Sequence, residues 1–325
     1  MRIELSIIYV NYYSKSELER SLASVEKFTK SAFEILIVNN SPLKENFDNL
    51  ESENAHVRTI NSAENYGFGK ACNMGISQAK GNFILLLNPD TFLKDNAIDS
   101  CLEAYKKLDP EKTGAFTCRH INEDGSFQYS SCRRGDLPRF PFIRVPWKRA
   151  SLSAKDYMNS SEKLQSVHGS SGYTYAVHGS FLMARKELLE QTPFDEDFFL
   201  YSEEIDLCRR LNAKGKKSYY YAEATIVHSS HRANESASIR NQMYLSSALL
   251  VLKMYGKGLF LFYHGLRVLR TLCLSVLIPF LPVTINAGLK SHLSDAKLFS
   301  KDYLKILRYK RGINSHIPLK SAALN

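Results

Sequence analysis

The sequence lacks the patterns that define several common classes of protein. Its six cysteines are scattered, with no CxxC pair and no metal-finger spacing, which argues against a zinc finger or a disulfide scaffold and suits thiols in a reducing compartment. The chain starts with a strand-like run, Ile3 to Val10. It lacks the charged start, the apolar core and the small-residue cleavage site that together define a signal peptide. We therefore expect a cytoplasmic protein.

Two familiar nucleotide-binding motifs are also missing. Gly67-Phe68-Gly69 followed by Gly75 does not fit GxGxxG, and it follows the third predicted strand instead of the first. No GxxxxGK[ST] sequence is present, so a P-loop is excluded as well. The chain also contains no internal repeat and no low-complexity tract.

The net charge of +10 belongs to one end of the chain. Residues 240–325 carry a net charge of +11, whereas residues 1–239 carry −1. Residues 258–287 are mostly apolar, but their uninterrupted run is shorter than the roughly 20 residues of a spanning helix. We predict that residues 258–311 lie against the inner leaflet of the cytoplasmic membrane as a peripheral segment, where basic side chains are attracted to anionic lipid. The alternative is a helical cap that packs on the catalytic body.

Strand and helix patterns alternate over residues 1–121, which predicts a doubly wound, mainly parallel α/β sheet. Strands are expected at 4–10, 33–38, 57–60 and 82–87, and helices at 70–78 and from a capping box at Ser14 and Glu17. Beyond residue 121 the pattern loosens, with an irregular stretch at 126–170, strand-like runs at 173–184, 218–221 and 224–227, and a helix from Ser202. We divide the chain into a domain at 1–239, with halves 1–121 and 122–239, and a helical C-terminal region at 240–325.

The most informative strand is the apolar run from Phe83 to Leu87, which stops at Asn88-Pro89-Asp90. A run without polar alternation indicates a strand covered on both faces. Ligands of open α/β sheets bind beyond the carboxyl ends of strands, which is where Asp90 is placed. Taken alone, the segment Asn88-Pro89-Asp90 is explained equally well as a turn that ends the strand and binds no ligand.

Polar residues follow other strands of the predicted sheet too, and they include Asn11, Asn39, Asn40 and Asn65. Each asparagine alone is more typical of a turn. Together with Asp90, however, they suit a nucleotide diphosphate, because amides bind a base or ribose and a carboxylate holds Mg2+ or Mn2+.

Acidic side chains gather again at Glu203 and Glu204, where a helix begins. Acidic side chains are common at the start of a helix, where they interact favourably with the positive end of the helix dipole. The functional alternative is a general base whose proton affinity is raised by neighbouring acids and burial. His228, after the last predicted strand, is either a metal ligand or a strand-end histidine with its hydrogen bonds satisfied, and His231 is a weaker candidate.

As a set, these motifs resemble a bacterial family 2 glycosyltransferase of the GT-A fold, in the rhamnosyltransferase-like branch. The matching segments cover roughly residues 3–245 in the family's order and are Val38-Asn39-Asn40-Ser41, Asn65 to Gly69 with Asn73 and Gly75, Leu87 to Thr91, Gly179 to Met183, Phe194 to Arg210, and Val227-His228.

The resemblance implies an inverting, metal-dependent transfer of a sugar from a nucleotide diphosphate sugar, dTDP-rhamnose or a UDP-sugar, to a lipid-linked saccharide in cell-surface polysaccharide synthesis. Asp90 then binds a divalent cation, Mg2+ or Mn2+, with His228 as a further ligand. Gly67 and Asn88 join the donor-binding asparagines. Glu204 corresponds to the catalytic base.

Departures from the family's pattern leave two questions open. The family usually has Glu-Asp where this chain has Glu203-Glu204, so the base is one of these two glutamates, and it commonly has Asp at the position of Asn39. A membrane-recruited sugar-nucleotide-binding protein without catalysis is the alternative function. Nucleic-acid binding is not expected, because the basic residues lie beside an apolar segment and do not alternate with stacking aromatics.

Overall fold

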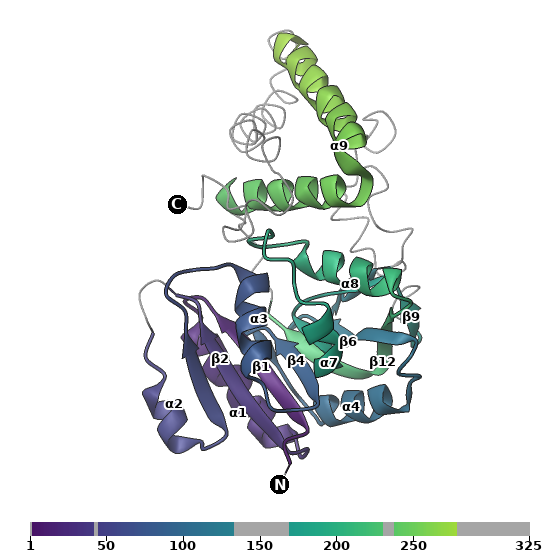
Figure 1. Cartoon of the computed structure of the whole chain (residues 1–325). Coiled ribbons are helices and arrows are strands. Elements are labelled where there is room, and N and C mark those ends of the chain that lie inside the picture. The colour runs from purple at the N-terminus through teal and green to yellow at the C-terminus, as the bar shows by residue number, and fades with distance from the viewer. Residues whose placement is uncertain (1, 42–44, 133–168, 230–236, 278–325) are drawn as a thin grey trace. The chain divides into compact units, whose positions relative to one another are not determined.

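A computed structural model of the protein describes residues 2–41, 45–132, 169–229 and 237–277 (Figure 1). These residues form two compact units, and the second consists of residues 196–203 and 237–277. Most of the irregular stretch expected at 126–170, the candidate His231 and the basic tail after residue 277 lie outside the described residues.

The first unit is built on a ten-stranded sheet with the strand order β3-β2-β1-β4-β11-β6-β12-β5, in which β7 also pairs with β6 and β9 with β12. The strands are β1 (Leu5–Asn11), β2 (Phe33–Asn39), β3 (Val57–Asn61), β4 (Phe83–Leu87), β5 (Thr91–Phe92), β6 (Thr113–Ile121), β7 (Phe127–Gln128), β9 (Gly172–Thr174), β11 (Phe181–Arg185) and β12 (Lys217–His228). A separate small sheet pairs β8 (Ser131–Cys132) with β10 (Ala176–Val177).

The four N-terminal strands are parallel, and their ends are aligned. Asn11 pairs in register with Asn39, and Asn39 pairs with Asn61, so three strands finish in an asparagine at one edge. β11 then enters antiparallel between β4 and β6, while β6 and β12 are parallel. The prediction of a mainly parallel α/β sheet is confirmed. The antiparallel strand β11 within it was not predicted from the sequence.

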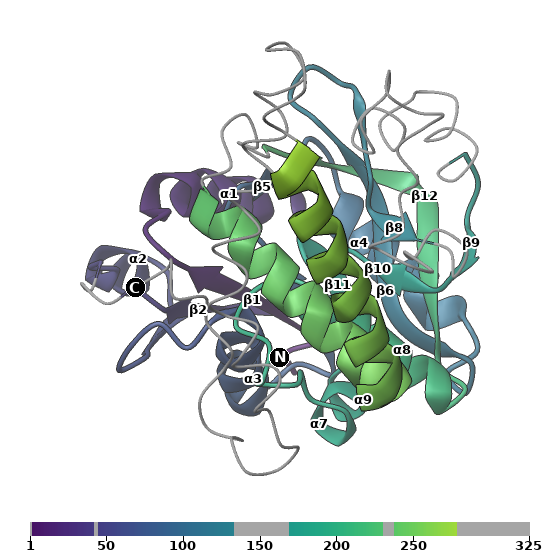
Figure 2. The same cartoon turned by 90° about the horizontal axis from the view of Figure 1, so that it is seen from above.

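Helices cover both faces of this sheet, as the unbroken apolar run of β4 predicted. The described helices of this unit are α1 (Lys15–Phe28), α2 (Asp48–Glu53), α3 (Phe68–Gln78), α4 (Ala97–Lys107), α7 (Lys186–Gln191) and α8 (Glu203–Ala213), and the second unit contains α9 (Ala237–Leu277). Figure 2 shows α1 and α3 on opposite sides of β1 and β2. Alternate residues of β4 join different cores, with Leu85 in the core that includes α1 and α4, and Leu86 in the core that includes α3 and α8.

Three details of the predicted elements are wrong. Ser14 precedes α1 but makes no capping hydrogen bond to it, because its hydroxyl donates to Asn11 Oδ1 at 3.2 Å. The run expected as one strand at 173–184 is divided among β9, β10 and β11. Conversely, the runs at 218–221 and 224–227 belong to one long strand, β12, whose pairing with β6 shifts register twice.

In the second unit, α9 consists of two straight rods that meet at an angle (Figure 1), with the break at Gly256, whose φ of 80° lies outside helical geometry. The first rod buries Leu245, Ala248 and Leu249. The second exposes several large apolar side chains, namely Leu259, Leu261, Phe262, Leu266 and Leu269. Among the described residues, Leu245–Phe262 is apolar enough to span a membrane, with a mean hydropathy of 1.4 and 39% of its residues buried. A core helix of a soluble protein satisfies the same criterion.

Candidate active site

The asparagines at the ends of β1 and β2 are fully buried. Asn11 donates from Nδ2 to Glu45 Oε2 at 2.6 Å and accepts the Ser14 backbone N–H at Oδ1. Asn39 donates from Nδ2 to the Glu45 backbone carbonyl at 2.9 Å and to Asn61 Oδ1 at 3.0 Å. Both amides therefore hold the loops at the carboxyl edge in this conformation.

Asn40 fixes the loop that follows β3. Its Nδ2 donates to Asn65 Oδ1 at 2.9 Å and to the Gly67 carbonyl at 3.2 Å, and its Oδ1 accepts the Tyr66 backbone N–H at 3.0 Å. Gly67 then starts α3 with a φ of 82°, a left-handed conformation that glycine adopts readily. The structure therefore brings Asn40, Asn65 and Gly67 together as one loop anchor.

Asp90 and His228 meet because of a strand pairing that sequence patterns did not indicate. β5 runs antiparallel to β12, and Thr91 is opposite His228 in the register. The His228 Nε2 atom consequently lies 3.3 Å from Asp90 Oδ1, and the Asp90 side chain is 28% exposed. The turn before Asp90 is held by the Asn88 backbone N–H, which donates to the Ser180 carbonyl at 3.0 Å.

The orientation of the His228 ring is set by Gln128 of β7, a residue that sequence analysis missed. The Gln128 amide nitrogen faces the carbonyl oxygens of His228 and of the Asn122 side chain, both of which only accept hydrogen bonds. Its Oε1 atom therefore faces His228 Nδ1, at 2.8 Å, and accepts a hydrogen bond from it. Since Nδ1 carries the proton, the neutral ring presents an unprotonated Nε2 toward Asp90.

Two further histidines that sequence analysis missed surround His228. The ring centroids of His178 and His120 lie 5.8 Å and 6.1 Å from that of His228. Ser180 links these two histidines, because its hydroxyl lies 2.9 Å from His178 Nδ1 and 3.2 Å from His120 Nδ1. The only signal near them in the sequence was the motif from Gly179 to Met183.

The two glutamates at the start of α8 differ in exposure. Glu203 is 4% exposed, whereas Glu204 is half-buried. Glu204 faces Gly179, since a Cβ atom built on that glycine would lie 4.0 Å from the Glu204 Cβ. Because the neighbouring Ser180 carbonyl binds the turn at Asn88, Glu204 lies near the same end of β4 as the Asp90 turn.

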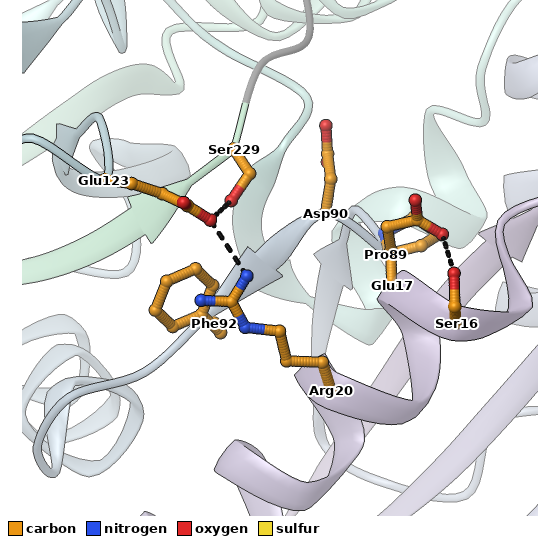
Figure 3. A pocket seen from close by; sticks show the side chains of 8 residues that line it. All are labelled: Ser16, Glu17, Arg20, Pro89, Asp90, Phe92, Glu123 and Ser229. Atoms are coloured by element: carbon orange, nitrogen blue, oxygen red, sulfur yellow. Dashed lines mark hydrogen bonds and ion pairs between the residues drawn. The ribbon is translucent and has the colours of Figure 1, made fainter.

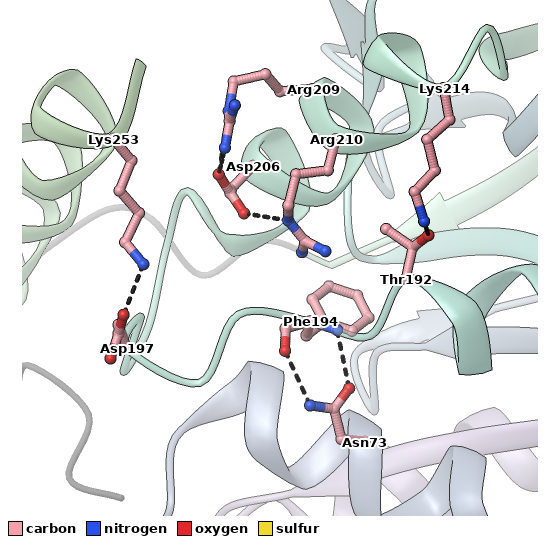
Figure 4. A network of polar contacts seen from close by, with 9 residues as sticks. All are labelled: Asn73, Thr192, Phe194, Asp197, Asp206, Arg209, Arg210, Lys214 and Lys253. Atoms are coloured by element: carbon pink, nitrogen blue, oxygen red, sulfur yellow. Dashed lines mark hydrogen bonds and ion pairs between the residues drawn. The ribbon is translucent and has the colours of Figure 1, made fainter. Parts of the chain in front are cut away.

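Another acid of α8 is committed to ion pairs. Asp206 is fully buried and contacts Arg209 Nη2 and Arg210 Nε, each at 2.6 Å (Figure 4). Both of its carboxylate oxygens are therefore engaged by guanidinium groups of the same helix. Of the three acids at 203, 204 and 206, Glu204 is the most exposed.

A cavity of about 360 Å³ opens beside Asp90. Figure 3 shows Arg20 between Phe92 and Glu123 in this cavity, with its guanidinium carbon 3.9 Å from the centroid of the Phe92 ring and Nη1 2.8 Å from Glu123 Oε1. The lining side chains come from α1, from the segment 89–92 and from the residues just after β6 and β12. They are Ser16, Glu17, Arg20, Pro89, Asp90, Phe92, Glu123 and Ser229. Asp90 thus lines this cavity together with several other polar and charged side chains.

Comparisons with known proteins identify the family and the fold. The sequence model described as glycosyl transferase family 2 matches residues 6–190, and the model described as glycosyl transferase family group 2 matches residues 145–301. In structure, GalNAc-T7, crystallised with UDP, GalNAc and Mn2+, superposes with a TM-score of 0.54 at 16% identity, over 76% of this chain and 48% of that one. This likeness confirms the GT-A fold.

Two relatives of known function indicate to which branch of the family the chain is similar. The N-acetylglucosaminyl-diphospho-decaprenol L-rhamnosyltransferase of Mycobacterium tuberculosis is 27% identical over 254 residues, which cover 71% of this chain and 77% of that protein. Rhamnosyltransferase WbbL of Escherichia coli K12 is 28% identical over 185 residues, 53% of this chain and 64% of WbbL. Because the family 2 model matches more than half of the chain, the protein belongs to glycosyltransferase family 2, in its rhamnosyltransferase-like branch.

Proposed function

We propose that this glycosyltransferase is an inverting, metal-dependent enzyme that moves a sugar from dTDP-rhamnose or a UDP-sugar to a lipid-linked saccharide in cell-surface polysaccharide synthesis. The observation that carries the proposal is the meeting of Asp90 and His228, 3.3 Å apart at the carboxyl edge of the sheet, near the same end of β4 as Glu204. We assign the catalytic domain to residues 1–239 and the helical extension to residues 240–325.

The residues at this edge fit a divalent cation that is shared with the donor. The described residues contain no group of three or more His, Cys, Asp and Glu side chains that could hold a metal ion alone. Mg2+ and Mn2+ sites in phosphate-transferring enzymes commonly use one or two protein ligands and complete their coordination with substrate phosphates. Asp90 Oδ1 and His228 Nε2 are suited to this role, and the bound cation would neutralise charge on the diphosphate.

We assign the proton transfer to Glu204. The acceptor hydroxyl oxygen attacks the anomeric carbon and forms a C–O bond while the bond from that carbon to the diphosphate oxygen breaks. The hydroxyl proton passes to the Glu204 carboxylate, and the nucleotide diphosphate leaves with the electron pair. Asn40, Asn65 and Gly67 shape the donor side of the edge, and we retain Asn11, Asn39 and Asn88 as residues that support it.

The relatives and α9 support a proposal for the acceptor and for the location of the enzyme. The mycobacterial relative's name specifies a diphospho-decaprenol substrate. In this chain the second rod of α9 exposes Phe262 at 59% and Leu269 at 58%. We propose that this apolar surface and the basic residues up to 311 hold a cytoplasmic enzyme at the inner leaflet, where a lipid-linked acceptor is available.

A donor panel tests the proposed function. The purified protein is expected to release nucleoside diphosphate from one sugar nucleotide in the presence of MnCl2 or MgCl2, and to release it faster when a lipid-linked saccharide is added. Nucleoside diphosphate is measured by a coupled assay, with EDTA as the control. Binding of a donor, measured by thermal shift, without release under any of these conditions would favour the alternative of a sugar-nucleotide-binding protein.

The hydrogen bond from His228 to Gln128 gives a second test. Gln128→Leu removes the acceptor for His228 Nδ1–H, so the ring is free to rotate, and metal affinity is expected to fall about 10- to 100-fold. Free Mn2+ measured by electron paramagnetic resonance, with UDP and MnCl2 present, gives the affinity without relying on turnover. Gln191→Leu, at an exposed position of α7, is the matched control. Unchanged Mn2+ affinity in Gln128→Leu would argue against His228 as a ligand.

A further inference from the structure

The segment immediately before Glu204 has an unusual backbone. Tyr201 and Ser202 both have a φ of 69°, in the left-handed region that residues other than glycine rarely adopt. Consecutive residues in this region persist only where surrounding contacts hold them. Residues 196–203 therefore depend on an external support.

The first rod of α9 supplies one part of that support. Ser246 donates from Oγ to the Leu200 backbone carbonyl at 2.6 Å, directly before the two left-handed residues. The same hydroxyl accepts a hydrogen bond from Gln242 Nε2 at 3.0 Å, which directs its single proton to Leu200. Gln242 is fully buried and Ser246 is 2% exposed, so water does not compete for these groups.

Lys253, two turns further along α9, supplies the second part. Its Nζ atom lies 2.6 Å from Asp197 Oδ2 (Figure 4), and the two side chains are only 12% and 15% exposed. The same ammonium group lies 5.5 Å from the ring centroid of Phe198, which is fully buried. A largely buried ion pair is costly to break from one side, because the remaining charge is left in a poorly solvated place.

The chain is also fixed on the other side of this segment, within the first unit. Asn73 of α3 accepts the Phe194 backbone N–H at 2.9 Å and donates to the Phe194 carbonyl at 3.0 Å (Figure 4). The backbone is thus held at Phe194, at Asp197 and at Leu200 before it enters α8. The contacts with α9 thus hold residues 196–203 up to the point where the chain enters α8.

We propose that Lys253 and Ser246 are positioning residues for catalysis: by holding residues 196–203 they set the place of the Glu204 carboxylate that receives the acceptor proton. This inference rests on the proposed function, and it assigns α9 a role besides membrane contact. A displacement of about 1 Å in a catalytic group can cost up to about 100-fold in rate, so a loosened segment should reduce turnover without preventing donor binding.

The test is Lys253→Met, which removes the ammonium group and keeps an apolar stem of similar length. We expect kcat for sugar transfer to fall at least about tenfold, with the KM for the donor and donor binding unchanged. Lys253→Arg should restore most of the activity. Asp197→Asn should cost about as much as Lys253→Met, and the double variant little more, because both remove one interaction. Lys257→Met, at an exposed lysine of the same helix, is the control.

Wild-type kcat in Lys253→Met would overturn the inference, as would a parallel fall of kcat, donor affinity and melting temperature, since that pattern is a general loss of structure. Failure of the proposed function is distinguishable. An inactive wild-type protein overturns both ideas, whereas an active wild type with inactive Glu204→Gln and unimpaired Lys253→Met overturns only the positioning role.

Discussion

Replacing Asp90 by alanine is expected to abolish sugar transfer. The side chain is 28% exposed at the end of β4 and lies within 3.3 Å of the His228 ring, so its removal takes away the anionic half of the proposed cation site. Charge neutralisation by a bound cation contributes several kcal/mol to such a transition state, which corresponds to a rate loss of about 1,000-fold or more. Nucleoside diphosphate release at saturating MnCl2 measures the effect.

Asp90→Asn separates the effect of the negative charge from that of side-chain shape, because the amide occupies nearly the same space as the carboxylate but carries no charge. We expect it to be nearly as inactive as Asp90→Ala. Asp95→Ala removes an exposed carboxylate five residues further along the chain and should leave activity unchanged. The prediction fails if Asp90→Ala retains more than about one tenth of wild-type turnover at an unchanged melting temperature, since a group that supplies several kcal/mol cannot be dispensable.

Much of the first half of the fold was predictable from the sequence, for a physical reason. Buried parallel strands are covered on both faces, so they consist of continuous apolar runs such as Phe83–Leu87 and end abruptly at polar turns. Because parallel strands end at the same edge, the polar residues after each run were expected to meet. The register of Asn11 with Asn39, and of Asn39 with Asn61, confirms this expectation.

The part that could not be predicted depends on pairings between distant segments. The short strand β5 carries too few residues for a periodic signal, yet its pairing with β12 brings His228 to Asp90. Gln128 is 100 residues from His228 in the chain, and its strand has two residues. No local pattern distinguishes such a glutamine from a surface residue.

The burial of polar side chains at the candidate site could not be predicted from the sequence either. Asn11 and Asn39 are residues of the kind found in ligand-binding turns. In the structure, however, their side-chain Nδ2 atoms donate hydrogen bonds to Glu45. The ambiguity between the two glutamates of α8 has a similar origin. Neighbouring residues of a helix point about 100° apart, so one faces inward while the other faces the ligand edge, and the sequence does not state which.

The pair Glu203→Gln and Glu204→Gln resolves that ambiguity. Glu204 is half-buried against Gly179, whereas Glu203 is 4% exposed, so Glu204 is the more accessible of the two and is the base that we propose. Glu204→Gln is expected to lower kcat by about 100- to 10,000-fold, the usual contribution of a general base, and to leave donor affinity and Mn2+ affinity unchanged.

The acid limb of the pH–rate profile should also disappear in Glu204→Gln, because glutamine does not titrate and only a residual, base-independent rate remains. Glu187→Gln on α7 replaces an exposed glutamate and serves as the control. Glu203→Gln is expected to retain most of the wild-type turnover for folded protein, since its side chain is enclosed at the helix start. The opposite order, with Glu203→Gln inactive and Glu204→Gln active at equal melting temperatures, would transfer the role of base to Glu203 and require the start of α8 to rotate when substrates bind.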